Sequence, residues 1–153
     1  MPEKPSWEEL HQKVRDLEKS IEIYRPFVDN SPDLFYRTSL DGKILYISPS
    51  VYRLSGYTVN EAIGMNLAEE IYLFPEERKI FIDKLQKKGQ VANFKAQLKR
   101  KNGSVWWAST SAHFYKDKDG KVLGVEGITR DITGIQTANQ ALKESEERFR
   151  LAF

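Results

Sequence analysis

The stretch from Val91 to Thr133 constrains the fold most, because it has the pattern of three consecutive antiparallel strands. Its first part, Val91–Arg100, alternates strictly between apolar and polar residues. A period of two is typical of a strand with one face on a core and the other face in water. The apolar face predicted for this strand consists of Ala92, Phe94, Ala96 and Leu98.

Two turns divide the rest of this stretch. Asn102-Gly103 is the residue pair preferred in two-residue type I′ hairpins, where both residues need a positive φ, and Asp119-Gly120 marks a second turn. The strands predicted after these turns are Ser104–Lys116 and Lys121–Asp131. A helical pattern follows Thr133 directly, so a change in the sheet can be passed to a helix.

A further hairpin precedes this region. Leu34–Leu40 and Lys43–Ser48 have strand patterns on either side of the turn signal Asp41-Gly42. A two-residue turn predicts that one face carries Phe35, Arg37, Ser39, Ile44, Tyr46 and Ser48, and the other Leu34, Tyr36, Thr38, Leu45 and Ile47. Both faces are largely apolar, so we expect the domain interior to cover one and the amino-terminal helix to cover the other.

Short helices are predicted between the two groups of strands. Pro49–Ser55 is a helix closed by Gly56, and a second turn of helix covers Asn60–Ile63. Pro75 opens a longer helix, Glu76–Lys88, with Gly89 as its cap. The apolar face predicted for this helix consists of Ile80, Phe81 and Leu85. Strands at both ends of the domain with helices between them indicate an α+β fold.

The amino-terminal segment has heptad spacing from Trp7 to Val28. Ser6 and Glu9 have the spacing of a capping box, and Pro26 is expected to end or kink the helix near Tyr24. The helix either lies on the sheet of its own domain or forms a dimeric coiled coil, and we favour self-association. The seam of that dimer would consist of Trp7, Leu10, Val14, Leu17, Ile21 and Tyr24.

The composition excludes several classes of function. The chain has 24 Lys and Arg against 22 Asp and Glu, a net charge of +2, which is no electrostatic footprint for nucleic acid. The absence of cysteine excludes disulfides, thiolate metal sites and cysteinyl chemistry. No nucleophile–base pair, metal-ligand cluster or glycine-rich phosphate loop marks an enzyme. Without a signal peptide or a membrane-spanning pattern, we expect a cytoplasmic segment that does not contact a membrane.

Several short motifs follow one another along the chain. The motifs are Ser31-Pro32-Asp33, Asp41-Gly42-Lys43-Ile44-Leu45-Tyr46-Ile47-Ser48-Pro49, Leu54-Ser55-Gly56-Tyr57, Glu61-Ala62-Ile63-Gly64, Asn102-Gly103-Ser104-Val105-Trp106-Trp107, Asp119-Gly120-Lys121-Val122-Leu123-Gly124 and Arg130-Asp131-Ile132-Thr133. In this order and spacing they resemble a PAS domain with its trailing PAC segment.

The resemblance, together with the hairpins, implies a five-stranded antiparallel sheet with strand order 2-1-5-4-3 and short helices on one face. Amphipathic helices flank the sheet at both ends. The expected organisation is an amino-terminal helix over residues 1–28, the PAS domain over residues 29–133, and an exit helix over residues 134–153 that leads towards a next domain.

Several polar or aromatic side chains are candidates for lining a ligand cavity: Phe35, Arg37, Tyr46, Ser48, Trp107, Ser109, Ser111 and His113. Ordinary core packing with satisfied hydrogen bonds is the alternative. By alternation, His113 shares a face with Trp107 and with Phe94 and Leu98 of the preceding strand. His113 either contacts a ligand or is a hydrogen-bonded core histidine, and a two-residue turn at Asp119-Gly120 places Glu126 opposite it.

The resemblance also bears on cofactors. Haem-binding members of the family carry an axial histidine on the long helix, and Glu76–Lys88 has none. Members that form a flavin–cysteinyl adduct or carry a cysteine-linked chromophore need a cysteine, which this chain lacks. We therefore expect no metal, no haem and no cysteinyl flavin, while a non-covalent flavin, an unknown small molecule or no ligand remain open.

The closing residues Asp131, Ile132 and Thr133 form the candidate signal junction. In the family, the matching Asp and Thr bond around the point where the last strand becomes a helix. An aspartate at a helix start accepts backbone N–H groups and suits the positive end of the helix dipole. Thr133 is expected to cap a helix that begins at Gly134–Ile135.

Taken together, these features predict a non-catalytic signal-sensing and dimerisation module of a multi-domain protein, such as a two-component sensor histidine kinase or a diguanylate cyclase. We expect a homodimer whose output kinase or cyclase domain lies in the same chain. The alternative is a ligand-free interaction spacer in a tandem array of PAS domains.

Overall fold

The computed structural model describes residues 3–152, and the chain divides into two units between Ser31 and Pro32. The first unit contains one helix, α1 (Trp7–Asp29). Its start is a capping box, as predicted: the Ser6 hydroxyl accepts the Glu9 N–H at 3.1 Å, and the Glu9 carboxylate accepts the Ser6 N–H at 3.1 Å.

Pro26 does not end α1 near Tyr24, because the helix continues to Asp29; the other predicted effect, a kink at this position, stays a prediction. A proline removes only its own N–H from the helix, and the Pro26 carbonyl still accepts the N–H of Asn30. The six seam residues of α1 are exposed, from 42% for Leu10 to 72% for Trp7.

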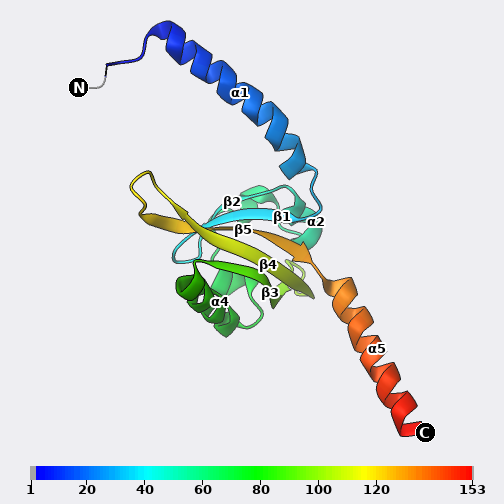
Figure 1. Cartoon of the computed structure of the whole chain (residues 1–153). Helices are drawn as coiled ribbons and strands as arrows, with labels where there is room; N and C mark the ends of the chain where they lie inside the picture. Colours follow the sequence, from blue (N-terminus) through cyan, green and yellow to red (C-terminus); the bar gives the residue numbers. More distant parts are fainter. Residues whose placement is uncertain (1–2, 153) are drawn as a thin grey trace. The chain divides into compact units, whose positions relative to one another are not determined.

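In the second unit, the strands of the described residues form one antiparallel sheet of five (Figure 1). They are β1 (Leu34–Ser39), β2 (Ile44–Ile47), β3 (Gln90–Lys99), β4 (Val105–Lys116) and β5 (Val122–Asp131). The strand order is β2-β1-β5-β4-β3, which confirms the predicted order and the α+β class.

Helices pack on one face of this sheet and close the core (Figure 1). They are α2 (Ser50–Ser55), α3 (Val59–Ala62), the π-helical turn η1 (Leu67–Ile71) and α4 (Pro75–Lys88). Gly56 and Gly89 close α2 and α4 in the left-handed conformation, as predicted. The helix α5 (Thr133–Ala152) follows β5.

The three hairpins of the described chain all have three-residue loops instead of the predicted two-residue turns. The bonds that close them run from Ser39 N–H to Lys43 O, from Arg100 N–H to Ser104 O and from Asp117 N–H to Lys121 O. In the second loop only Gly103 has a positive φ, at 87°, whereas Asn102 does not, so this is no type I′ turn. A tight turn followed by a left-handed glycine is the usual three-residue hairpin loop.

The extra loop residue moves β4 by one position against β3, so that Leu98 pairs with Trp106 and Phe94 with Thr110. Because a one-residue slip exchanges the two faces of a strand, Trp106 faces the interior and Trp107 faces outward. The prediction that His113 shares a face with Phe94 and Leu98 is therefore wrong. The residues of β4 that are buried are Trp106, Ala108, Thr110 and Ala112.

Bulges correct two further assignments. In the first hairpin Arg37 pairs with Tyr46 but Thr38 pairs with Ile44, so Ile44 lies on the buried face and not with Phe35. In β3, a register shift between Val91 and Phe94 leaves Ala92 exposed and breaks the predicted strict alternation.

The buried face of α4 also differs from the expectation. Arg78, Phe81 and Leu85 are buried at helical spacing, whereas Ile80 is 51% exposed. Arg78 thus occupies an interior position near Phe81. Its side chain is part of the site described below.

Candidate functional site

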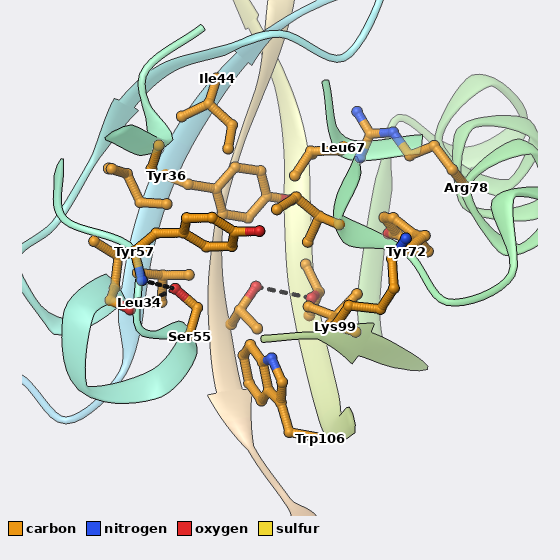
Figure 2. Close-up of a pocket in the computed structure, with 17 residues that line it drawn as sticks. Leu34, Tyr36, Ile44, Ser55, Tyr57, Leu67, Tyr72, Arg78, Lys99 and Trp106 are labelled. Carbon is orange, nitrogen blue, oxygen red and sulfur yellow. Dashed lines mark hydrogen bonds between the residues drawn. The ribbon is translucent and has the colours of Figure 1, made fainter. Parts of the chain in front are cut away.

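A cavity of about 60 Å³ lies between the inner face of the sheet and the helices that cover it (Figure 2). Most of its wall is apolar, and the wall comes from all five strands and from the helices α2, α3, η1 and α4 of the second unit. Representative lining residues are Leu34 of β1, Ile44 of β2, Val51 of α2, Ala62 of α3, Leu67 of η1 and Leu98 of β3. Such a wall favours an apolar body over a fully polar one.

Arg78 is the charged group buried in this wall. It is 5% exposed, and its guanidinium carbon lies 5.0 Å from the centre of the Phe81 ring. Within residues 3–152, neither of its terminal nitrogens makes a hydrogen bond of good geometry and no carboxylate forms an ion pair with it, although the Tyr36 and Tyr72 hydroxyls are near enough to interact with the guanidinium. A buried arginine normally has both, so this cation is left without its usual partner.

Two tyrosines lie near this guanidinium. Burial raises the pKa of the Tyr36 and Tyr72 hydroxyls, and the positive charge of Arg78 lowers both pKa values only in part. Both tyrosines therefore remain neutral around neutral pH. Figure 2 shows Arg78 at the upper right of the group of lining side chains and Trp106 at its lower edge.

Trp106 supplies a second unpaired donor. Its side chain is 2% exposed, and its indole N–H has no acceptor within the described part of the chain. Close to it in the wall, the Thr110 and Thr129 hydroxyls form a hydrogen bond of 2.8 Å between β4 and β5. The polar content of the cavity is thus two buried donor groups, several hydroxyls and Lys99 of β3, which also lines the wall.

Among the described residues that line the cavity, none belongs to the eight candidates chosen from the sequence. Ser48 is buried, but its hydroxyl accepts the Phe35 N–H at 2.9 Å and lies 3.1 Å from the Ser50 hydroxyl, so it holds the start of α2. The other seven belong to β1, β2 and β4 and alternate with the strand residues that face the interior; they are Phe35, Arg37, Tyr46, Trp107, Ser109, Ser111 and His113.

A polar row crosses this outer face. Glu126 of β5 accepts hydrogen bonds from Arg37 at 2.6 and 3.1 Å and lies 2.9 Å from the His113 ring. The guanidinium carbon of Arg37 also lies 4.3 Å from the centre of the Tyr115 ring. Partial burial pushes the pKa of Glu126 up, but the hydrogen bonds from Arg37 and His113 outweigh burial and hold the pKa below its usual value.

The predicted pairing of His113 with Glu126 is confirmed, although the reasoning contained two errors that cancel. The loop is one residue longer than assumed, and a bulge between Tyr115 and Lys116 restores the register. The His113 side chain is 58% exposed, so the interpretation as a core histidine is wrong.

The junction between β5 and α5 is tied to β4. Asp131 accepts the N–H of Thr133 at 2.9 Å, as predicted. The Thr133 hydroxyl, however, accepts the Trp107 N–H of β4 at 3.0 Å instead of capping the helix, which starts at Thr133 itself. The Ile132 N–H donates to the Trp107 carbonyl at 2.9 Å, so both backbone groups of Trp107 bind the start of α5.

Arg78 and Trp106 were missed because the sequence reasoning selected apolar residues on α4 and the wrong face of β4. A signal for Arg78 was present, since it precedes Phe81 and Leu85 by three and seven positions and so shares their helical face. Within residues 3–152, no group of three His, Asp or Glu side chains is arranged to hold a metal ion. No helix of that part is both long and apolar enough to cross a bilayer.

Comparison with known proteins places this geometry in a wider context. A family model described as a PAS domain matches residues 32–134. The chain is 25% identical over 146 residues to Sporulation kinase C of Bacillus subtilis (strain 168), and the match covers 92% of the chain but only 34% of the kinase. The chain thus spans about a third of the length of that kinase.

Solved structures share the fold at low identity. The PAS domain of a protein from Colwellia psychrerythraea matches with a TM-score of 0.66 and 21% identity, over 75% of this chain and 98% of that one. An RNA-binding light-oxygen-voltage receptor matches with a TM-score of 0.67 and 20% identity, over 88% of this chain and 39% of the receptor.

Proposed function

The chain belongs to the PAS domain family, and we propose that it is a non-catalytic module that senses a signal and relays it to an output domain through α5. The observation that carries this proposal is the junction, where Trp107 of β4 bonds to both Ile132 and Thr133. A shift of β4 against β5 would alter these bonds and so change how α5 leaves the sheet.

The similarity to a sporulation kinase three times as long supports an output domain in the same chain, with a kinase as the first candidate. We propose a cytoplasmic location for the module, as its kinase-like context suggests. A homodimer through α1 is part of the proposal, because exposed apolar residues at heptad spacing are stabilised when a second helix covers them.

The size of the cavity bears on the cofactor. A cavity of about 60 Å³ is well below the roughly 150 Å³ in which benzene binds, and a haem or a flavin is several times larger than benzene. We therefore propose that the module carries neither, and an absorption spectrum of the purified protein with a visible haem or flavin band would contradict this.

The alternative function is a ligand-free dimerisation spacer between other domains. The two buried donors without acceptors, Arg78 and Trp106, favour sensing, since a purely structural core satisfies such groups. A spacer would also need no particular bonds between β4 and the first residue of α5.

Replacement of Asp131 tests the relay. Asp131→Ala removes one bond at the start of α5, which costs about 1 kcal/mol, against on the order of 5–15 kcal/mol of total stability. The module should therefore melt close to wild type, while a fusion to its native output domain should show altered basal output and lose its dependence on the signal.

A matched control removes the same kind of bond far from the junction. Asp117 accepts the N–H groups of Asp119 and Lys121, both at 2.9 Å, in the β4–β5 loop. Asp117→Ala should leave output regulated. Normal regulation in the Asp131→Ala fusion, with an unchanged melting temperature, would make the junction an ordinary helix start and refute the relay.

A further inference from the structure

We propose that the cavity binds a small organic anion with one carboxylate, and that Arg78 of α4 is the residue that holds it. This inference rests on the sensing role proposed above and names the chemical class of the signal. Its basis is the combination of a buried guanidinium without an anionic partner, a mostly apolar wall and a volume that limits the size of the occupant.

The state of Arg78 indicates the charge of the occupant. A guanidinium removed from water needs an anion or several acceptors, because burying an unpaired charge is strongly unfavourable. Arg78 contacts the face of the Phe81 ring, and the neutral Tyr36 and Tyr72 hydroxyls lie near it, but in the described chain no carboxylate pairs with its two terminal nitrogens. Two parallel N–H donors match the two oxygens of a carboxylate.

Glu77 does not supply this anion. One of its carboxylate oxygens is buried without a partner, yet no ion pair joins it to Arg78 within residues 3–152. Neighbouring residues on a helix point in different directions and do not face each other. Tyr36 and Tyr72 do not repel an anion, because burial raises their pKa values and keeps both hydroxyls neutral.

The wall of the cavity defines the rest of the ligand. A cavity of about 60 Å³ is well below the roughly 150 Å³ in which benzene binds, so it fits only a carboxylate with a short tail. Leu67, Ile71 and Leu98 line it with apolar groups, which suit an aliphatic tail better than a second charge. Acetate, propionate and butyrate are such carboxylates, with tails of increasing length.

Arg78 also borders a groove on the surface of the domain. A surface groove runs between the β1–β2 loop and α4, lined by Asp41, Gly42 and Lys79 among others. Arg78 is the one described residue that lines both the groove and the cavity. Arg78 thus lies between the groove and the cavity, and the groove carries the positive charge of Lys79 and the negative charges of Asp41 and Asp83.

The test uses the Trp106 indole, which lines the cavity, as a reporter. The chain has three tryptophans, so a ¹H–¹⁵N spectrum should show three indole signals, and Trp7→Phe and Trp107→Phe assign the Trp106 signal by elimination. Propionate should shift this signal saturably, with a dissociation constant between micromolar and millimolar. Propionamide, which has the same shape without the charge, should bind at least about tenfold more weakly.

Two variants complete the test. Arg78→Met keeps an apolar side chain in the wall and should weaken propionate binding at least about tenfold, whereas Lys79→Met, at the exposed neighbouring position, should change it much less. The absence of a saturable shift with all three acids would overturn the inference, and so would equal binding of propionamide. If Arg78→Met does not fold, the propionate–propionamide comparison on the unmodified chain still decides.

These outcomes are separable from those of the relay. Binding is measured on the module without any output domain, so a failure to bind refutes the ligand class alone. A failure of the Asp131→Ala fusion to lose regulation refutes the relay, whether or not propionate binds.

Discussion

The hydroxyl of Thr133, the first residue of α5, accepts the backbone N–H of Trp107 in β4 at 3.0 Å. This bond joins the helix to a strand that is not its neighbour in sequence. Since the Trp106 side chain next to it lines the cavity, the same segment of β4 connects the interior of the domain to the start of α5.

The bond can be tested by amide exchange. Thr133→Val removes the acceptor while keeping the shape of the side chain, so the Trp107 N–H should exchange with solvent faster by about tenfold. Thr133→Ser keeps the hydroxyl and serves as the control, with exchange close to wild type. Unchanged protection of Trp107 in Thr133→Val would show that another group covers this N–H.

If the apolar seam of α1 holds the dimer together, a charge at the centre of the seam should prevent dimerisation. Leu17→Glu would place a carboxylate between apolar helices, and we expect sedimentation to show monomers in place of a dimer. Lys19→Glu introduces the same side chain two residues away, off the seam, and should leave the dimer intact. A dimer that survives Leu17→Glu would move the interface away from α1.

The lowered pKa of Glu126 predicts that the stability of the domain depends on pH. Its pKa in the folded protein lies below the usual 4.5, so its contribution is complete above about pH 4.5 and is lost as the pH falls through the lowered value. The difference in unfolding free energy between wild type and Glu126→Gln should be less than about 1 kcal/mol and constant near neutral pH, and should shrink in acid.

The partner of Glu126 offers the control for this measurement. In an Arg37→Met background, which removes two of the hydrogen bonds to Glu126, the Glu126→Gln difference should vary less with pH. Denaturant unfolding between neutral and acid pH measures the effect of Glu126→Gln in the wild type and in the Arg37→Met background. If the difference in unfolding free energy between the wild type and Glu126→Gln grew in acid, this would contradict the lowered pKa of Glu126.

A side chain added at Gly124 of β5 is predicted to clash severely with its neighbours. A Cβ there would lie 2.0 Å from the Thr38 carbonyl oxygen and 2.8 Å from the Tyr115 ring, so the β1–β5 pairing would have to open. We expect Gly124→Ala to destabilise the domain by about 3 kcal/mol or more, seen as a lower melting temperature. Gly134→Ala in α5, where no atom lies within 4 Å, should be neutral or slightly stabilising. Equal melting of the two variants would contradict this account.

The sequence by itself determined the order of the elements and most of their limits. Glycines mark the three hairpins and the ends of α2 and α4, because these positions need a left-handed backbone that other residues adopt only with strain. The alternation in the strands and the resemblance to a known family then led to the correct strand order. The pairing of Asp131 with the Thr133 N–H also followed from local chemistry.

The tertiary structure alone decided which face of each strand is inside. Trp106 and Trp107, or Tyr36 and Phe35, are equally good interior residues by composition, so the choice depended on the register. A single additional loop residue changes that register and exchanges the faces, and glycine-containing turns of two and three residues look alike in sequence. The burial of Arg78 in place of Ile80 was likewise decided by the direction from which α4 packs on the sheet, because the contacts that orient a helix come from residues far away in the chain.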